Sequence, residues 1–196
     1  MASQHETLDV DIQWMDELSQ KIGRPVSTNL SQIDESPNLW REVLHRMEQA
    51  PDSSQVIGQA SGRAIGIVMG MDLTAHPFAT CPYFLQELMH IPPEERRQKL
   101  MQKETQEKLL ADTPLSLGAF EDFITGTFSR MFPFNDEPDY EPTPDMSIAA
   151  LAEKNGCTPQ EEALKHLLAY EGRGFLYFPL FNYAENSLDP TYELLN

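Results

Sequence analysis

Near the start of the chain, segments whose apolar side chains have helical spacing alternate with short segments typical of strands. Apolar side chains recur at helical spacing over Leu8–Ile22, with acidic residues between them. Val26–Leu30 and Gln55–Gln59 are short enough for strands of a buried sheet, and Ser36-Pro37 predicts the start of a helix between them. This succession of helix, strand, helix and strand is typical of an α/β protein with a parallel sheet.

Three glycines, Gly62, Gly66 and Gly70, recur at every fourth position after the second predicted strand. Their spacing permits close packing against a neighbouring backbone. The segment has neither the Lys-Ser/Thr end of a P-loop nor the spacing of a Rossmann fingerprint, so it predicts no phosphate-binding loop.

The second half of the chain is predominantly helical in pattern. Residues 81–131 give only helical signals and predict a helical insertion, and the proline-rich acidic stretch 133–144 predicts a solvated connector. Ser147 caps the next predicted helix, and Thr158-Pro159-Gln160-Glu161 is a capping box that starts another, running to about Tyr170. Phe175–Leu180 is apolar enough for a strand covered on both faces.

These elements predict one domain over residues 1–196. Its parts are strand–helix units at about 8–72, the helical insertion at about 81–131, the connector 133–144, and a helix–helix–strand segment at 147–183.

The composition narrows the classes of partner. The formal charge of −17 argues against nucleic acid and against an anionic membrane surface, which both require clustered Lys and Arg. We expect a soluble cytoplasmic protein, because no apolar run approaches the length of a membrane span or a secretory signal. Cys81 and Cys157 lie far apart in the sequence and are expected to be unpaired thiols.

No local motif supplies a complete catalytic or metal site. The five histidines have no partner at i+2 or i+4, so the sequence contains neither HxH nor HExxH. It also lacks a GxSxG elbow and a Cys-His arrangement.

Four side chains are candidates for substrate binding, because each lies in a loop or just beyond a predicted strand. Arg63 could bind a substrate carboxylate or form a surface salt bridge. His76, held extended by the proline after it, could face a ligand or bond to the backbone. Asn182 and Tyr183 follow the last strand, where α/β barrels keep polar site residues; Tyr183 could equally be an aromatic at the edge of the core.

An ordered series of segments resembles the amidohydrolase family that includes the N-acyl-D-amino-acid deacylases, or D-aminoacylases. The most specific segments are DYEPTPDMSIAALA (Asp139–Ala152) and LYFPLFNYA (Leu176–Ala184). The other segments, in chain order, are Gly23–Val26, Trp40-Arg41, Gln55-Val56, Gly62-Arg63, His76–Phe78 and Met131–Pro133. The similarity runs from about Asp9 to the end and matches the middle and later part of such an enzyme.

The resemblance implies an α/β fold, namely part of a (β/α)8 barrel of a metal-dependent amidohydrolase with a largely helical insertion. Family members use zinc held in the barrel to activate a water molecule that attacks an amide carbonyl. The HxH motif and the later aspartate segment of the family are missing from this sequence. We therefore expect zinc in the parent enzyme, no metal on this chain alone, and no catalytic residue here; Arg63, His76, Asn182 and Tyr183 are carried over as substrate-binding residues.

Three functions remain open on the sequence. The chain could be part of a hydrolase that acts on the amide bond of N-acyl-D-amino acids and is inactive alone. It could be a remnant or split-gene subunit that binds a complementary barrel fragment. An enzyme of another class is the third, although no residue pattern favours it.

Overall fold

The computed structural model describes residues 4–51, 53–134 and 136–196, with the backbone alone for residues 4–9. It is a mixed α/β protein, which confirms the class expected from the sequence. The chain divides into two compact units. We call the part up to Ile65 together with Leu180–Asn196 the terminal unit, and Gly66–Pro179 the central unit.

The terminal unit contains a pair of parallel strands joined through a helix. Its elements, in chain order, are α1 (Gln4–Ile22), β1 (Val26–Asn29), α2 (Leu39–Glu48), β2 (Val56–Gln59) and α9 (Asp189–Leu195). The predicted parallel pairing is confirmed, because β1 pairs with β2 in a parallel register from Val26 opposite Val56 to Asn29 opposite Gln59.

Both helices α1 and α2 pack against one face of this strand pair. Ile12 and Met15 of α1 and Leu39 of α2 form a buried cluster, against which Val26 and Val56 pack. Alternate strand residues lie on the opposite face and are exposed: Ser27, Asn29, Ile57 and Gln59. The period-2 alternation of strands therefore leaves one face of this small sheet without a covering layer among the described residues.

The helix α2 starts later than its sequence predicts. Ser36 forms an isolated bridge with Ile33, and its carbonyl accepts a hydrogen bond from the N–H of Leu39. Asn38 is the residue before the first helical turn. The predicted start at Ser36-Pro37 is therefore wrong, because Ser36 is engaged in a turn with Ile33.

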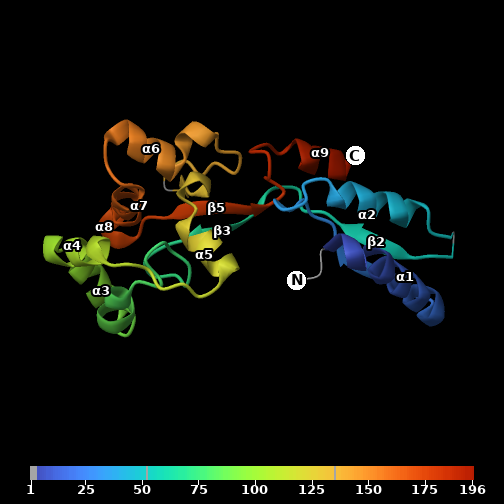
Figure 1. Cartoon of the computed structure of the whole chain (residues 1–196), viewed down its shortest axis with the longest axis horizontal. Helices are drawn as coiled ribbons and strands as arrows, with labels where there is room; N and C mark the ends of the chain where they lie inside the picture. The colour runs from blue at the N-terminus through green and yellow to red at the C-terminus, as the bar shows by residue number, and fades with distance from the viewer. Residues whose placement is uncertain (1–3, 52, 135) are drawn as a thin grey trace. The chain divides into compact units, whose positions relative to one another are not determined.

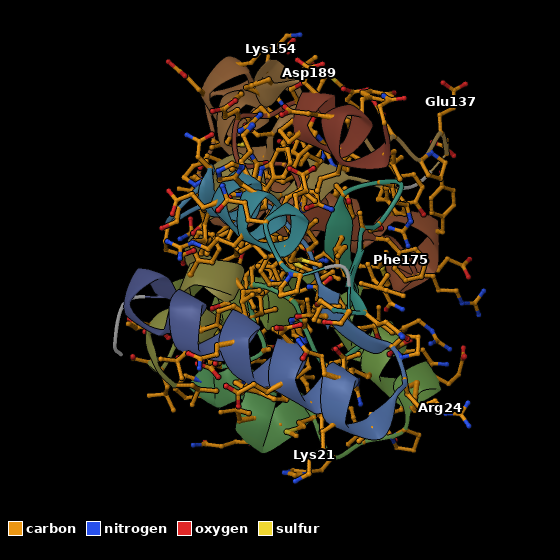
Figure 2. The ribbon with its side chains drawn as sticks, turned by 90° about the vertical axis from the view of Figure 1, so that its right-hand side faces the viewer. Lys21, Arg24, Glu137, Lys154, Phe175 and Asp189 are labelled. Carbon is orange, nitrogen blue, oxygen red and sulfur yellow. The ribbon has the colours of Figure 1, made fainter. Side chains whose placement is uncertain are left out.

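The end of α1 carries positive charge. Figure 2 shows Lys21, in its last turn, and Arg24, just after it, with side chains that extend away from the ribbon. Cations at this position interact favourably with the negative end of the helix dipole.

The central unit is largely helical around a small sheet. Its strands are β3 (Ile65–Met69), β4 (Phe132–Pro133) and β5 (Leu176–Phe181), of which β3 begins and β5 ends within the terminal unit. Its helices are η1 (Phe84–Leu88, a π-helix), α3 (Pro93–Leu100), α4 (Lys103–Ala111), α5 (Ala119–Gly126), η2 (Phe128–Arg130), η3 (Pro144–Met146), α6 (Ile148–Asn155), α7 (Pro159–Leu167) and α8 (Ala169–Gly172). The helical character predicted for residues 81–131 is present, interrupted by residues 112–118, which have no regular secondary structure.

Helices α6 and α7 begin at the residues that their capping signals predict. The Ser147 hydroxyl accepts a hydrogen bond from the N–H of Ala150. Thr158 and Glu161 form a reciprocal capping box at the start of α7. Each cap satisfies N–H groups that lack a partner inside the helix.

The predicted continuation of α7 to Tyr170 is wrong. The helix ends at Leu167, and Tyr170 and Glu171 adopt left-handed backbone angles with φ of 53° and 61°. The chain then turns sharply, and a Cβ on Gly174 would lie 1.9 Å from the carbonyl oxygen of His166. Glycine is therefore required at the turn that leads into β5.

The three-stranded sheet has the order β3–β5–β4, with β4 antiparallel to β5. Figure 1 shows β5 beside β3. β5 is buried along Leu176–Pro179, as its apolar sequence predicts. β3 was not predicted, because its glycines mask a strand period. Asn135, in the predicted connector, lies outside the described residues.

Gly66 in β3 allows the close approach of β5. A Cβ at this position would lie 2.3 Å from Tyr177 Cε2 and 2.8 Å from the carbonyl oxygen of Phe178. The Tyr177 side chain is itself buried and stacks on Phe134, so it has little room to move.

We therefore predict that Gly66→Ala lowers the free energy of unfolding of the central unit by about 1–3 kcal/mol through overpacking. Urea denaturation followed by circular dichroism measures this. Gly126→Ala is the control, because a Cβ there meets nothing within 4 Å and should leave stability unchanged or slightly raised. Equal effects of the two substitutions would contradict the close packing of β3 on β5.

Candidate functional site

The candidate site lies at the carboxyl ends of β1 and β2. Because the strands are parallel and Asn29 lies opposite Gln59, both strands end at the same edge of the sheet. The segments that follow them, Leu30–Gln32 and the one that contains Arg63, therefore start from this edge. α/β proteins bind ligands at the carboxyl ends of parallel strands.

A cavity of about 400 Å³ opens at the end of β1 within the terminal unit. Its walls come from α1, the end of β1, α2 and Phe181. The lining residues are Asp11, Ile12, Met15, Thr28, Asn29, Leu30, Ser31, Ile33, Leu39, Trp40, Val43 and Phe181. A mostly apolar wall with a few polar groups at one end is typical of a small-molecule pocket.

Asn182 is held in the fold by a reciprocal pair of hydrogen bonds with Gln32, which we call the Gln32–Asn182 clamp. The N–H of Gln32 donates to Asn182 Oδ1 at 2.8 Å, and the N–H of Asn182 donates to the Gln32 carbonyl at 3.0 Å. The Gln32 side chain accepts a third bond from the N–H of Ala184 at 3.1 Å. Asn182 is fully buried and has a left-handed φ of 61°, which asparagine tolerates better than most residues. Its oxygen is thus engaged in structure, while its Nδ2 has no hydrogen-bond acceptor among the described residues.

Tyr183 directly follows Asn182, and Arg63 is the sequence neighbour of Ala64, which packs against Tyr183. Tyr183 is buried in a small cluster with Ala64 and Leu188, so it belongs to the core and not to its wet edge. Arg63, next to Ala64 in sequence, is exposed and donates from Nη1 to the Ala64 carbonyl at 3.1 Å. The structure therefore brings Arg63, Asn182 and Tyr183 into the terminal unit.

His76 belongs to the central unit. Its ring is completely buried and lies edge-on to Phe84, with centroids 4.5 Å apart. Neither ring nitrogen has a hydrogen-bond partner among the described residues, so of the two alternatives for His76 the bond to the backbone is not present. Burial, with a smaller contribution from the charge of Arg96, lowers the pKa of His76 to about 3.

Hydrogen bonds to backbone carbonyls hold the charged guanidinium of Arg96 near His76. The guanidinium donates to the carbonyls of Leu88, Met71, Met89 and Ile91 at 3.0–3.3 Å. It ties η1 to the loop after β3, and so has a structural role beside His76.

The donors present do not fit a zinc site. In the part of the chain that the structure describes, no group of three or more His, Cys, Asp or Glu side chains is close enough to hold a metal ion. Catalytic zinc needs three protein ligands that converge on one point. No step of a metal-dependent reaction is therefore assigned to these residues.

In comparisons with known proteins, no family model, curated protein or solved structure matches this chain. Across the described ranges, none of the helices has both the length and the apolar character needed to cross a bilayer.

The sequence did not reveal the roles of Gln32, which bonds to Asn182, and of Trp40, which lines the cavity. Gln32 carries no motif, and its role depends on a segment 150 positions away. Trp40 forms part of the resemblance, but its helical spacing indicated only a core position. The indole Nε1 of this buried side chain lacks an acceptor among the described residues.

We predict that Asn182→Ala destabilises the terminal unit by about 2–4 kcal/mol, because it leaves the N–H of Gln32 unpaired and puts alanine in a left-handed conformation. Asn182→Gly removes only the acceptor and should cost about 1–3 kcal/mol. Asn186→Ala tests the backbone effect alone, since Asn186 is exposed with φ of 55°. Denaturant unfolding of the three variants measures this; an Asn182→Gly variant as stable as wild type would exclude the clamp.

A second prediction concerns pH. The unfolded chain binds a proton at His76 below about pH 6.5, whereas the folded chain does so only near pH 3, so stability is lost as the pH falls through this window. His76→Leu should remove up to about 1.4 kcal/mol per pH unit from the slope of unfolding free energy against pH. The exposed His90 provides the control His90→Leu, which should keep the wild-type slope. Identical slopes for His76→Leu and wild type would mean that His76 is not buried as a neutral ring.

Proposed function

We propose that this chain is the substrate-side part of a hydrolase that acts on the amide bond of N-acyl-D-amino acids, within a (β/α)8 barrel of the amidohydrolase type. In this proposal the water-activating metal centre is built by other strands of the barrel. The chain alone binds the substrate without hydrolysing it.

The observation that carries the proposal is the parallel β1–α2–β2 unit with a cavity at its carboxyl edge. A strand, a helix and a parallel strand form the repeating unit of a (β/α)8 barrel, and such barrels place their sites at this edge. The resemblance of the ordered sequence segments to D-aminoacylases, most specific at Asp139–Ala152 and Leu176–Ala184, supports the same assignment.

The apolar wall of the cavity suits an N-acyl amino acid, although its one charged lining residue, Asp11, is acidic. Ile12, Leu39 and Phe181 offer apolar surface for an acyl chain or an apolar amino-acid side chain. Trp40 Nε1, in the cavity wall, is a buried donor without an acceptor among the described residues, and it is complementary to a carbonyl or carboxylate oxygen. Arg63 is exposed beyond the end of β2, and in this proposal its guanidinium binds the substrate carboxylate.

The exposed face of the strand pair supports a second role for the same unit, namely binding of other strands of the barrel. Ser27 and Asn29 lie beside Ile57 and Gln59 on this face, and Ile57 is 49% exposed. In a closed barrel the corresponding face points to the interior and is filled by side chains of other strands. We infer that complementary barrel strands, in the same longer polypeptide or in another chain, cover this face.

The proposal predicts binding without turnover. Trp14 is half exposed and Trp40 is buried beside the cavity, so the variant Trp14→Phe leaves one fluorophore at the site. N-acetyl-D-methionine should change the emission of Trp40 at lower concentrations than N-acetyl-L-methionine does. Chromatography of the same mixtures with added Zn²⁺ should show no released methionine.

Two variants locate the binding. Val43→Phe fills the cavity and should abolish the emission change, whereas Val10→Phe, on the exposed side of α1, should not. Hydrolysis by the chain alone, or an emission change that survives in Val43→Phe, would contradict the proposal.

A further inference from the structure

The central unit contains a second cavity, of about 320 Å³, which is separate from the site at the strand ends. It lies between the segment after His76, the ends of α4 and α5, and the extended stretch that joins these two helices. Its lining includes Phe78, Cys81, Leu109, Asp112, Asp122 and Phe128.

The charged groups of this lining are all negative. Asp112 and Asp122 contribute carboxylates, and no Lys, Arg or His is among the lining residues. Within the described ranges neither aspartate forms an ion pair, so their charges are not neutralised by the protein. Cavities lined by one sign of charge concentrate ions of the opposite sign.

Both carboxylates are held in place by hydrogen bonds. Asp112 Oδ2 accepts from the N–H of Tyr83 at 2.6 Å. Asp122 accepts from the Ser116 hydroxyl at 2.5 Å and from the N–H of Leu117 at 3.1 Å. These bonds orient the carboxylates and leave further lone pairs for a ligand, since each carboxylate has about four acceptor positions.

Two helix carboxyl ends add to the negative potential. α4 ends at Ala111, immediately before Asp112, and α5 ends at Gly126, which lines the cavity with Thr125. The carboxyl end of a helix carries a partial negative charge that favours a cation. An aspartate just after such an end is electrostatically unfavourable until a cation binds beside it.

The remaining wall is apolar and aromatic. Phe78, Leu109 and Phe128 contribute hydrophobic surface, and aromatic faces also attract organic cations. Cys81 is buried in the same wall; burial and the nearby Asp112 raise its pKa to about 11, so it remains a neutral thiol.

We propose that this cavity is a binding site for a small organic ammonium ion with an apolar body. The ammonium group lies against Asp112, just after the carboxyl end of α4, and Asp122, in the first turn of α5, and the body packs on Phe78, Leu109 and Phe128. A bare divalent metal ion fits less well, because no third carboxylate, His or Cys completes a metal-binding group in the described part of the chain. The site is independent of the function proposed for the terminal unit.

The test compares three ligands of similar shape and different charge. 2-Phenylethylammonium, 2-phenylethanol and 3-phenylpropanoate are titrated into the intact chain by calorimetry at low salt. The ammonium ion should bind about tenfold or more tightly than the alcohol, and the carboxylate should not bind, because two carboxylates distinguish them by charge. This comparison uses the wild-type protein and does not depend on the folding of a variant.

Two substitutions then locate the site. Asp112→Asn and Asp122→Asn should each weaken binding of 2-phenylethylammonium about three- to tenfold, as expected for loss of a partly exposed ion pair. Asp145→Asn, an exposed aspartate outside the cavity, should leave affinity unchanged. Equal affinity for ammonium ion and alcohol, no binding of the ammonium ion, or unchanged affinity in both cavity variants would overturn the proposal.

Discussion

The terminal unit depends on the exchange of hydrogen bonds between Gln32 and Asn182. These residues are 150 positions apart, yet each gives a backbone N–H and accepts one in return. Buried N–H groups without partners cost about 1–3 kcal/mol each, so this pair holds the segment after β1 against the segment after β5. The bidentate contact of Arg41 with Glu193 and the packing of Tyr183 on Ala64 join the same parts of the chain.

This constraint determines what the candidate site contains. Phe181 precedes Asn182 directly, so the clamp places an aromatic side chain in the wall of the cavity at the end of β1. It also explains why Asn182 and Tyr183 act first as structural residues: the oxygen of Asn182 is committed to Gln32, and the Tyr183 ring is enclosed in the core. Among the candidate residues of the terminal unit, Arg63 alone extends an exposed charge.

Local signals in the sequence predicted the elements whose causes are local. Three signals depend only on residues within a few positions: the capping box at Thr158, the Ser147 cap, and the short segments that form β1 and β2. The structure has all of these elements. The strand β3 was missed because its glycines mask a strand period, and its close packing of Gly66 against Tyr177 is a contact that no local pattern encodes. The kink at Tyr170 and the role of Gln32 likewise depend on distant partners. Arg63, Asn182 and Tyr183 were chosen because they follow strands, and that rule located their unit but could not distinguish a core residue from a ligand-facing one.

The most direct test of this account is amide hydrogen exchange at single-residue resolution. If the Gln32–Asn182 clamp closes the terminal unit, the amides of Gln32 and Asn182 should exchange with the same free energy of opening as Val26 and Leu30, whose N–H groups donate to β2 and its flanking residues. Rapid exchange at Asn182 while β1 remains protected would contradict the account, because the segment after β5 would then be no part of the unit that forms the site.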